Sequence, residues 1–198
     1  MSRHRNSVIQ YKLKTLEMLK KRSFKINPKR SLFLNSGFTE KDADILVRDL
    51  FELNLSKGKI FLQMNGNGGS FAGAKKIYDN ICLSPNSVYG IVSGNAFSAI
   101  AIVLQACCKR YATNLSKFHI HHVSYPISFT INVNDKITDL TDLMTKEMLQ
   151  LRTNDGIMAE ILGKRMTVSR EEIGNILDND ADLSALDAKN LGLIDEII

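Results

Sequence analysis

The sequence is poor in proline and cysteine and lacks long apolar runs. It has three prolines in 198 residues and no Gly/Ser-rich linker, which argues against an inter-domain hinge, so we expect one domain over residues 1–198. No apolar run approaches the roughly 18–20 residues that span a bilayer, so no membrane partner is expected. The three cysteines, two of them adjacent, suit neither a disulfide framework nor a Cys-x-x-Cys metal site. We therefore expect a reducing, cytoplasmic compartment, with no metal and no cofactor.

The net positive charge of the chain is confined to its N-terminus. Residues 1–30 contain ten Lys/Arg and one Glu, a net charge of +9, whereas the remaining residues carry a net charge of −4. Such an arm could contact nucleic acid or an anionic surface. Apolar residues at helical spacing favour instead a helix docked on the body: Ile9, Leu13, Leu16 and Leu19. We expect residues 1–29 to form this basic arm, residues 30–198 to form the core, and no nucleic acid to bind. The arm lacks the apolar region of a secretory signal, and an organellar presequence is an alternative.

Strand-like and helix-like segments alternate along the core. The segments "RSLFLNSGF", "GKIFLQM", "SVYGIVS" and "FHIHHVS" have the pattern of strands, and helical patterns follow the first three. Thr39 is a plausible N-cap of the first helix, with Asp42 completing a capping box. This alternation predicts parallel strands joined by right-handed crossovers, an α/β fold.

The chain changes character in its last third, where a long amphipathic helix is expected from about Asp135 to Gly163. Its apolar residues recur at spacings of three, four and seven: Ile137, Leu140, Met144, Met148, Leu151, Met158 and Leu162. A helix of this length outreaches a domain of this size, so its stripe packs either on another subunit or within the chain. Ser169 and Glu172 predict a cap for a further helix. The segment "DLSALDAKNLGLIDEII" then reads as a turn, a short helix ended by Gly192, and a last strand.

Two glycine-bearing turns follow strands and open helices, "NGNGGS" and "GNAFS". The first alone is a weak signal, and a phosphate-binding loop is disfavoured because no Gly-Lys-Ser/Thr follows. Ser98 in the second turn could simply cap its helix or could be a nucleophile. Backbone N–H groups of Gly69 and Ala99 could together bind a developing oxyanion. Cys107 and Cys108, further along the helix, are expected in the core.

A nucleophilic serine needs a base and a group that orients the base. Three of the four histidines fall in "FHIHHVS", where His119 and His121 would share one face of a strand and His122 the other. Periodicity does not choose between His119 and His121. Carboxylates are available in "LDNDADLSA", and each alone could be a solvated turn residue: Asp178, Asp180 and Asp182.

Three blocks together resemble the proteolytic subunit of the Clp protease, a self-compartmentalised serine peptidase family. "IFLQMNGNGGSFAGAKKIYDNI" is similar to the family's strand, Gly-rich turn and helix. "GIVSGNAFSAIAIVLQACCKRYATNLSKFHIHH" resembles its nucleophile turn and histidine strand, and "DADLSALDAKNLGLIDEII" resembles its C-terminal block. The match runs in register from about Arg30 to the end. It implies the ClpP/crotonase fold of repeated β-β-α units, with the long protruding helix used for oligomer contacts.

The resemblance also implies the site residues. It assigns the nucleophile to Ser98, the base to His121, the orienting carboxylate to Asp180, and the oxyanion donors to Gly69 and Ala99. The chain departs from the family at Asn67, where proline is usual, at Phe97, where a small residue is usual, and at Gln63, where tyrosine is common. After His121 the chain reads "HVSYPISFTINV", without the family's glycines.

Three functions are compatible with these residues. The first is a serine endopeptidase that cleaves polypeptides inside a homo-oligomeric ring, with an AAA+ unfoldase as a partner implied by the family. The second is a non-proteolytic structural or regulatory ring subunit. The third is a crotonase-type enzyme, which needs no Ser/His/Asp set. The presence of all three residue types favours the first.

Overall fold

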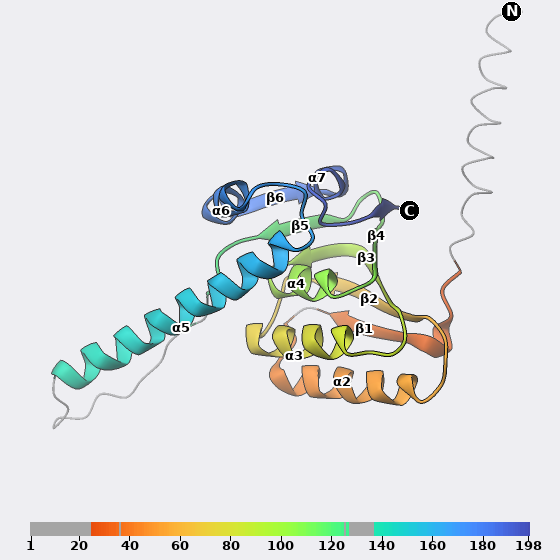
Figure 1. The fold of residues 1–198 in the computed structure, drawn as a ribbon, viewed down its shortest axis with the longest axis horizontal. Coiled ribbons are helices and arrows are strands. Elements are labelled where there is room, and N and C mark those ends of the chain that lie inside the picture. The colour runs from red at the N-terminus through yellow and green to blue at the C-terminus, as the bar shows by residue number, and fades with distance from the viewer. Residues whose placement is uncertain (1–24, 36, 125, 127–136) are drawn as a thin grey trace, which may run out of the picture.

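A sheet of seven strands organises the part of the chain that the computed structural model describes, residues 25–35, 37–124, 126 and 137–198 (Figure 1). The strands are β1 (Ser31–Asn35), β2 (Ile60–Gly66), β3 (Val88–Phe97), β4 (Lys109–Ala112), β5 (Lys117–Ile120), β6 (Ala181–Ser184) and β7 (Glu196–Ile197). The helix expected in the N-terminal arm lies outside these residues, and so does most of the segment between Ser124 and Ile137.

The strand order explains how the chain builds a largely parallel sheet. Five strands follow the order β1-β2-β3-β4-β7, and each neighbouring pair in this row is parallel. The end of β3 also pairs in parallel with β5, and β5 pairs with β6 antiparallel. The predicted α/β class is confirmed, whereas β4 and β6 were not expected as strands.

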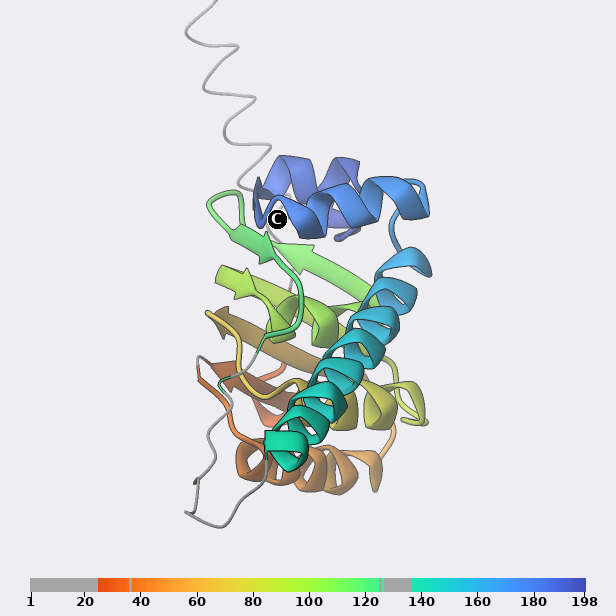
Figure 2. The same ribbon diagram turned by 90° about the vertical axis from the view of Figure 1, so that its left-hand side faces the viewer.

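Six α-helices accompany the sheet in the described residues: α2 (Glu40–Asn54), α3 (Phe71–Cys82), α4 (Ala99–Gln105), α5 (Ile137–Gly163), α6 (Arg170–Asp178) and α7 (Ala185–Asn190). Helix α3 packs between α2 and α4, and Figure 2 shows α6 and α7 at the opposite end of the molecule from α2. The predicted capping box of α2 is present, because Thr39 and Asp42 each accept the other's backbone N–H. Ser169 likewise accepts the N–H of Glu172 at the start of α6.

Helix α4 is the centre of the core. All seven of its residues are buried, and it lies directly against β3 at Gly90. A Cβ at Gly90 would come within 2.6 Å of Leu104 and 2.9 Å of the Cys107 sulfur, so any larger residue would force these side chains to shift. Burial raises the pKa of Cys107, as expected for a core thiol. The same expectation for Cys108 is wrong, because its side chain is exposed once α4 has ended.

Helix α5 extends away from the body of the molecule (Figure 1). Its C-terminal part is anchored in the core through Met158, Ile161 and Leu162. Its N-terminal part leaves apolar side chains exposed, with Met144 at 56% and Met148 at 51%. The predicted stripe is therefore buried within the chain at one end only.

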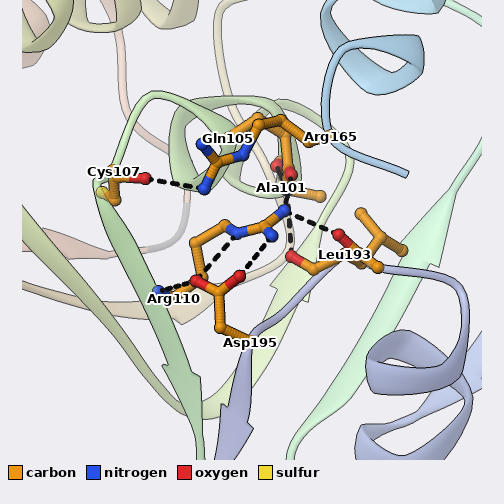
Figure 3. A network of polar contacts seen from close by, with 8 residues as sticks. Ala101, Gln105, Cys107, Arg110, Arg165, Leu193 and Asp195 are labelled. Atoms are coloured by element: carbon orange, nitrogen blue, oxygen red, sulfur yellow. Dashed lines mark hydrogen bonds and ion pairs between the residues drawn. The ribbon is translucent and has the colours of Figure 1, made fainter. Parts of the chain in front are cut away.

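A buried arginine joins the end of α4 to the C-terminal part of the fold (Figure 3). The Arg110 side chain is 5% exposed and its guanidinium donates to Asp195 at 2.6 Å, to Gln105 at 2.8 Å and to the Gly192 carbonyl at 2.7 Å. Burial alone would raise the pKa of Asp195, but hydrogen bonds from the Arg110 side chain and backbone outweigh it and lower that pKa. The carboxylate thus stays ionised beside its partner.

Truncation of this arginine should be among the most damaging single changes. We expect Arg110→Ala to lower the free energy of unfolding by about 3–5 kcal/mol, because Asp195 and Gln105 lose their buried partner. Urea unfolding measures the change. Arg48→Ala is the matched control, since the Arg48–Asp49 pair is solvent-exposed and such pairs contribute about 0–1 kcal/mol. Equal effects of the two substitutions would contradict a central role for the Arg110 network.

Candidate active site

Ser98 stands between the end of β3 and the start of α4. It occupies the N-cap position of α4, but its side chain makes no capping hydrogen bond. Its backbone N–H donates to the His119 carbonyl of β5 at 2.7 Å. The serine is therefore fixed through its backbone, and its hydroxyl is not used as a cap.

The backbone of Ser98 is strained. Among the described residues, the only non-glycine residues with positive φ are Ser98 at 53° and Asp180 at 47°. Such conformations cost about 1–3 kcal/mol each and concentrate at functional sites. A serine on a strained strand-to-helix turn has its hydroxyl presented at the end of the sheet, as in nucleophile elbows. Both strained positions are residues that the resemblance assigned to the site.

A bulge in β3 precedes this turn. The register with β2 passes from Met64 opposite Val92 to Gly66 opposite Ala96, which leaves extra residues in β3. The Asn65 side chain fills this gap and accepts the Asn95 N–H at 3.0 Å. Bulges bend a strand and re-aim its side chains next to active sites. The sequence analysis did not predict that Asn65 would bind the bulge of β3. A polar residue near the end of an otherwise apolar strand is the pattern that could have indicated it.

The glycine turn after β2 lies against Ser98. Gly68 has φ of +112°, and a Cβ there would lie 2.9 Å from the Ser98 Cβ. Gly69 follows in an isolated bridge with Phe38, and a Cβ at Gly69 would overlap the Phe38 carbonyl oxygen. Glycine at position 68 thus permits the close approach of the two turns, and glycine at position 69 permits the contact with Phe38. The N–H of Gly69 belongs to one turn, and the N–H of Ala99 to the other, at the first residue of α4.

His119 has a carboxylate partner on the neighbouring strand. It lies opposite Asp182 in the β5–β6 ladder, and its Nδ1 is 2.8 Å from Asp182 Oδ1. Its ring also lies 5.6 Å from the Phe97 ring and 5.4 Å from the His121 ring, centroid to centroid. These three rings form a row beside the Ser98 turn. The pairing with Asp182 was not predicted, because 63 residues separate the partners.

His121 lies one residue beyond the end of β5, so the expected strand is shorter than its sequence pattern suggested. Its Nδ1 is 2.6 Å from the His122 carbonyl oxygen. Since a carbonyl only accepts, Nδ1 must carry the proton in this contact and a neutral His121 ring leaves Nε2 as an acceptor. No hydrogen bond between described residues joins His121 to Ser98 or to Asp180.

The β5–β6 register relates His121 to Asp180. The last two pairs of the ladder are His119 with Asp182 and Ile120 with Ala181. One further step in the same register would set His121 opposite Asp180, in the same type of pair as His119 and Asp182. Asp180 is exposed and precedes β6 directly.

His122 is held by two carboxylates. Its Nδ1 is 2.6 Å from Asp155 Oδ2 on α5, and its Nε2 is 2.8 Å from Asp178 Oδ1, the last residue of α6. The hydrogen bond to Asp178 raises its pKa most, burial opposes this, and Asp155 raises it further. The sequence offered no signal for this pairing beyond the acidic composition of the two helices.

The described part of the chain offers neither a metal cluster nor a membrane span. Within it, no group of three or more His, Cys, Asp or Glu side chains is placed to hold a metal ion. In the same residues, no helix combines the length and the apolarity needed to cross a membrane.

Comparison with known proteins shows the family of the chain. The family model of Clp protease matches residues 16–198. The chain belongs to the Clp protease family. Relatives include the ATP-dependent Clp protease proteolytic subunit 1 of Chlamydia muridarum, 31% identical over 88% of both chains. The proteolytic subunit 2 of Streptomyces coelicolor is 30% identical, over 88% of this chain and 78% of its own. The proteolytic subunit 2 of Prochlorococcus marinus is 31% identical, over 88% of this chain and 84% of its own. Membership supports a peptidase activity for this Clp protease family protein.

The glycine turn of this Clp protease family member can be tested by adding one methyl group. We expect Gly68→Ala to lower the free energy of unfolding by about 1–3 kcal/mol, because positive φ and contact with Ser98 both oppose a Cβ. Gly174→Ala is the control, since a Cβ there meets nothing within 4 Å inside α6, and it should stabilise by about 0.4–1 kcal/mol. Chemical denaturation distinguishes them. A neutral Gly68→Ala would show that the two turns are not in close contact.

Proposed function

We propose that the protein is a serine endopeptidase in which Ser98 is the nucleophile, His121 the general base and Asp180 the group that orients the base. The observation that carries this proposal is the conformation of Ser98, which has positive φ at a strand-to-helix turn and makes no capping bond. A structural serine at a helix N-terminus would use its hydroxyl as a cap. The strain is understandable where the hydroxyl has a chemical role.

The protonation of the histidine supports its role as the base. The Nδ1 contact requires a proton on Nδ1, and the neutral ring with that tautomer accepts a serine proton at Nε2. In this structure His121 Nδ1–H donates a hydrogen bond to the His122 carbonyl. The role proposed for Asp180 is to accept the hydrogen bond from Nδ1–H once substrate is bound, and the continued β5–β6 register favours it.

The reaction follows from these positions. Ser98 Oγ attacks the carbonyl carbon of a peptide bond while its proton passes to His121 Nε2. The N–H groups of Gly69 and Ala99 are the proposed donors to the tetrahedral oxyanion, an interaction worth about 10²–10³ in rate per donor. The proton on His121 then goes to the leaving amine, and an acyl-enzyme forms on Ser98. Water hydrolyses this ester by the same route, and no cofactor is needed.

Assembly into a ring is the second part of the proposal. The exposed side chains of α5 include Met144 and Met148 and form an apolar surface, which is typical of a protein–protein interface. The family implies an oligomeric ring, and contact between copies of the chain along α5 would bury these residues. Active sites would then face an enclosed chamber, which suits unfolded polypeptides as substrates. The relatives are named ATP-dependent, which suggests an AAA+ unfoldase as a partner.

The nucleophile and base are tested by labelling with a fluorophosphonate read by intact mass. We expect one adduct per chain, none in Ser98→Ala, and labelling about 10²–10⁴-fold slower in His121→Gln, since general-base assistance contributes that much. His119→Gln is the matched control. It removes the neighbouring ring and a hydrogen bond whose carboxylate partner is exposed, and should keep most of the labelling rate.

Three results would count against this assignment. Loss of labelling in His119→Gln alone would make His119 the base. An adduct that persists in Ser98→Ala would place the nucleophile elsewhere. No adduct with folded wild-type protein would favour the non-proteolytic ring subunit.

The assembly surface is tested by adding charge to α5. The double substitution Met144→Lys, Met148→Lys should dissociate the oligomer, because each buried methionine contributes about 1.5–3 kcal/mol and a buried lysine is costly. Sedimentation velocity measures the size. Gln150→Lys adds charge to an exposed position of the same helix and should leave the assembly intact. A wild-type monomer, or a double variant that assembles normally, would contradict the proposed contact.

A further inference from the structure

The peptide group between His122 and Val123 is held from both sides. Its carbonyl oxygen, that of His122, accepts from His121 Nδ1 at 2.6 Å. Its N–H, that of Val123, donates to Asp155 Oδ1 at 2.7 Å. Because a trans peptide is planar, its C=O and N–H point in opposite directions. Asp155 therefore fixes the direction of the carbonyl that orients the His121 ring.

The His122 side chain holds Asp155 in place. Asp155 uses Oδ1 for the Val123 N–H and Oδ2 for His122 Nδ1, so its two oxygens bind both ends of one short segment. The other ring nitrogen of His122 reaches Asp178 of α6 at 2.8 Å. The imidazole of His122, the residue that follows the proposed base, thus joins its segment to both α5 and α6.

This arrangement requires His122 to be protonated. Ionised carboxylates only accept hydrogen bonds, so both ring nitrogens must donate, which only the imidazolium can do. A neutral ring would have one donor and would lose one of its two carboxylates. The segment would then be held by a single helix.

We propose that His122 is a positioning residue: its ring, held between Asp155 and Asp178, fixes the His122–Val123 peptide and thereby orients the imidazole of His121 in the free enzyme, before substrate binds. The inference rests on the proposed function, because the orientation of His121 matters only if it acts as the base. It assigns a role to three side chains that the triad does not use, and it involves no contact of His122 with substrate.

The proposal has a pH signature. The charged groups that face His122 are Asp155 from α5 and Asp178 from α6, and its neighbour along the chain is His121. The hydrogen bond to Asp178 raises the pKa of His122 most. Burial lowers this pKa and the hydrogen bond to Asp155 raises it, so it lies above its ordinary value. The two-sided contact is therefore complete at low pH and is lost as the pH rises through that raised pKa. His121 acts as a general base only when it is neutral, so the reaction rate rises with pH. The rate falls again when His122 loses its proton and one of its two carboxylates, so the pH–rate profile is bell-shaped.

The experiment is the fluorophosphonate labelling rate as a function of pH in the full-length protein. We expect a bell-shaped dependence of the labelling rate on pH for wild type. In Asp178→Asn the fall of the rate at high pH should begin at lower pH, because the main cause of the raised His122 pKa is gone. His122→Gln should lose the alkaline limb and label up to about 100-fold more slowly, the cost of a misplaced catalytic group. His119→Gln, which removes a histidine of β5 three positions before His122, should keep the wild-type profile.

The outcomes separate this inference from the proposed function. If wild type does not label at any pH while folded, the proposed function fails and the inference fails with it. If wild type labels through Ser98, but Asp178→Asn and His122→Gln both keep the wild-type profile, only the positioning role is overturned. Asp178 is a surface carboxylate, so its amide variant remains informative even where His122→Gln loses stability.

Discussion

Strand β3 hydrogen-bonds to three other strands, and the candidate site lies where its partner changes. On one side it follows β2, and on the other its first half pairs with β4 and its last residues with β5. The change occurs at the bulge around Gly94, which has φ of +116°. Sites in open α/β sheets form where neighbouring strands diverge beyond their carboxyl ends. The backbone hydrogen bond from Ser98 to His119 belongs to this same junction, so Ser98 and the histidine segment are placed by one set of main-chain hydrogen bonds.

Three histidines within four residues have three different environments. His119 contacts one carboxylate on the next strand, His121 contacts a backbone carbonyl, and His122 lies between two carboxylates. A carbonyl allows an imidazole to remain neutral, whereas two carboxylates favour its charged form. The segment thus separates a histidine suited to proton transfer from one suited to an ion pair. Sequence spacing alone could not distinguish them.

The features that sequence predicted are those set by neighbouring residues. The Thr39–Asp42 capping box and the long amphipathic helix α5 depend on contacts within one or two turns, and both were expected. Strands β4 and β6 were missed because "KRYA" and "ADLS" are short and polar, and β3 and β5 supply their hydrogen bonds.

The site divides in the same way. Ser98 was recognised from its local turn, but only the resemblance to a family chose His121 over His119. The partners of His122 lie 33 and 56 residues away, a distance that no local pattern spans.

The ion pair of Arg110 with Asp195 also sets an order of events during synthesis. The two residues are 85 positions apart, which a ribosome adding about 5–20 residues per second covers in roughly 4 to 17 seconds. Until Asp195 is available, burial of the guanidinium beside α4 would cost its desolvation with no carboxylate to offset it. We therefore expect the contact of β4 with α4 to become stable only after β7 has joined the sheet.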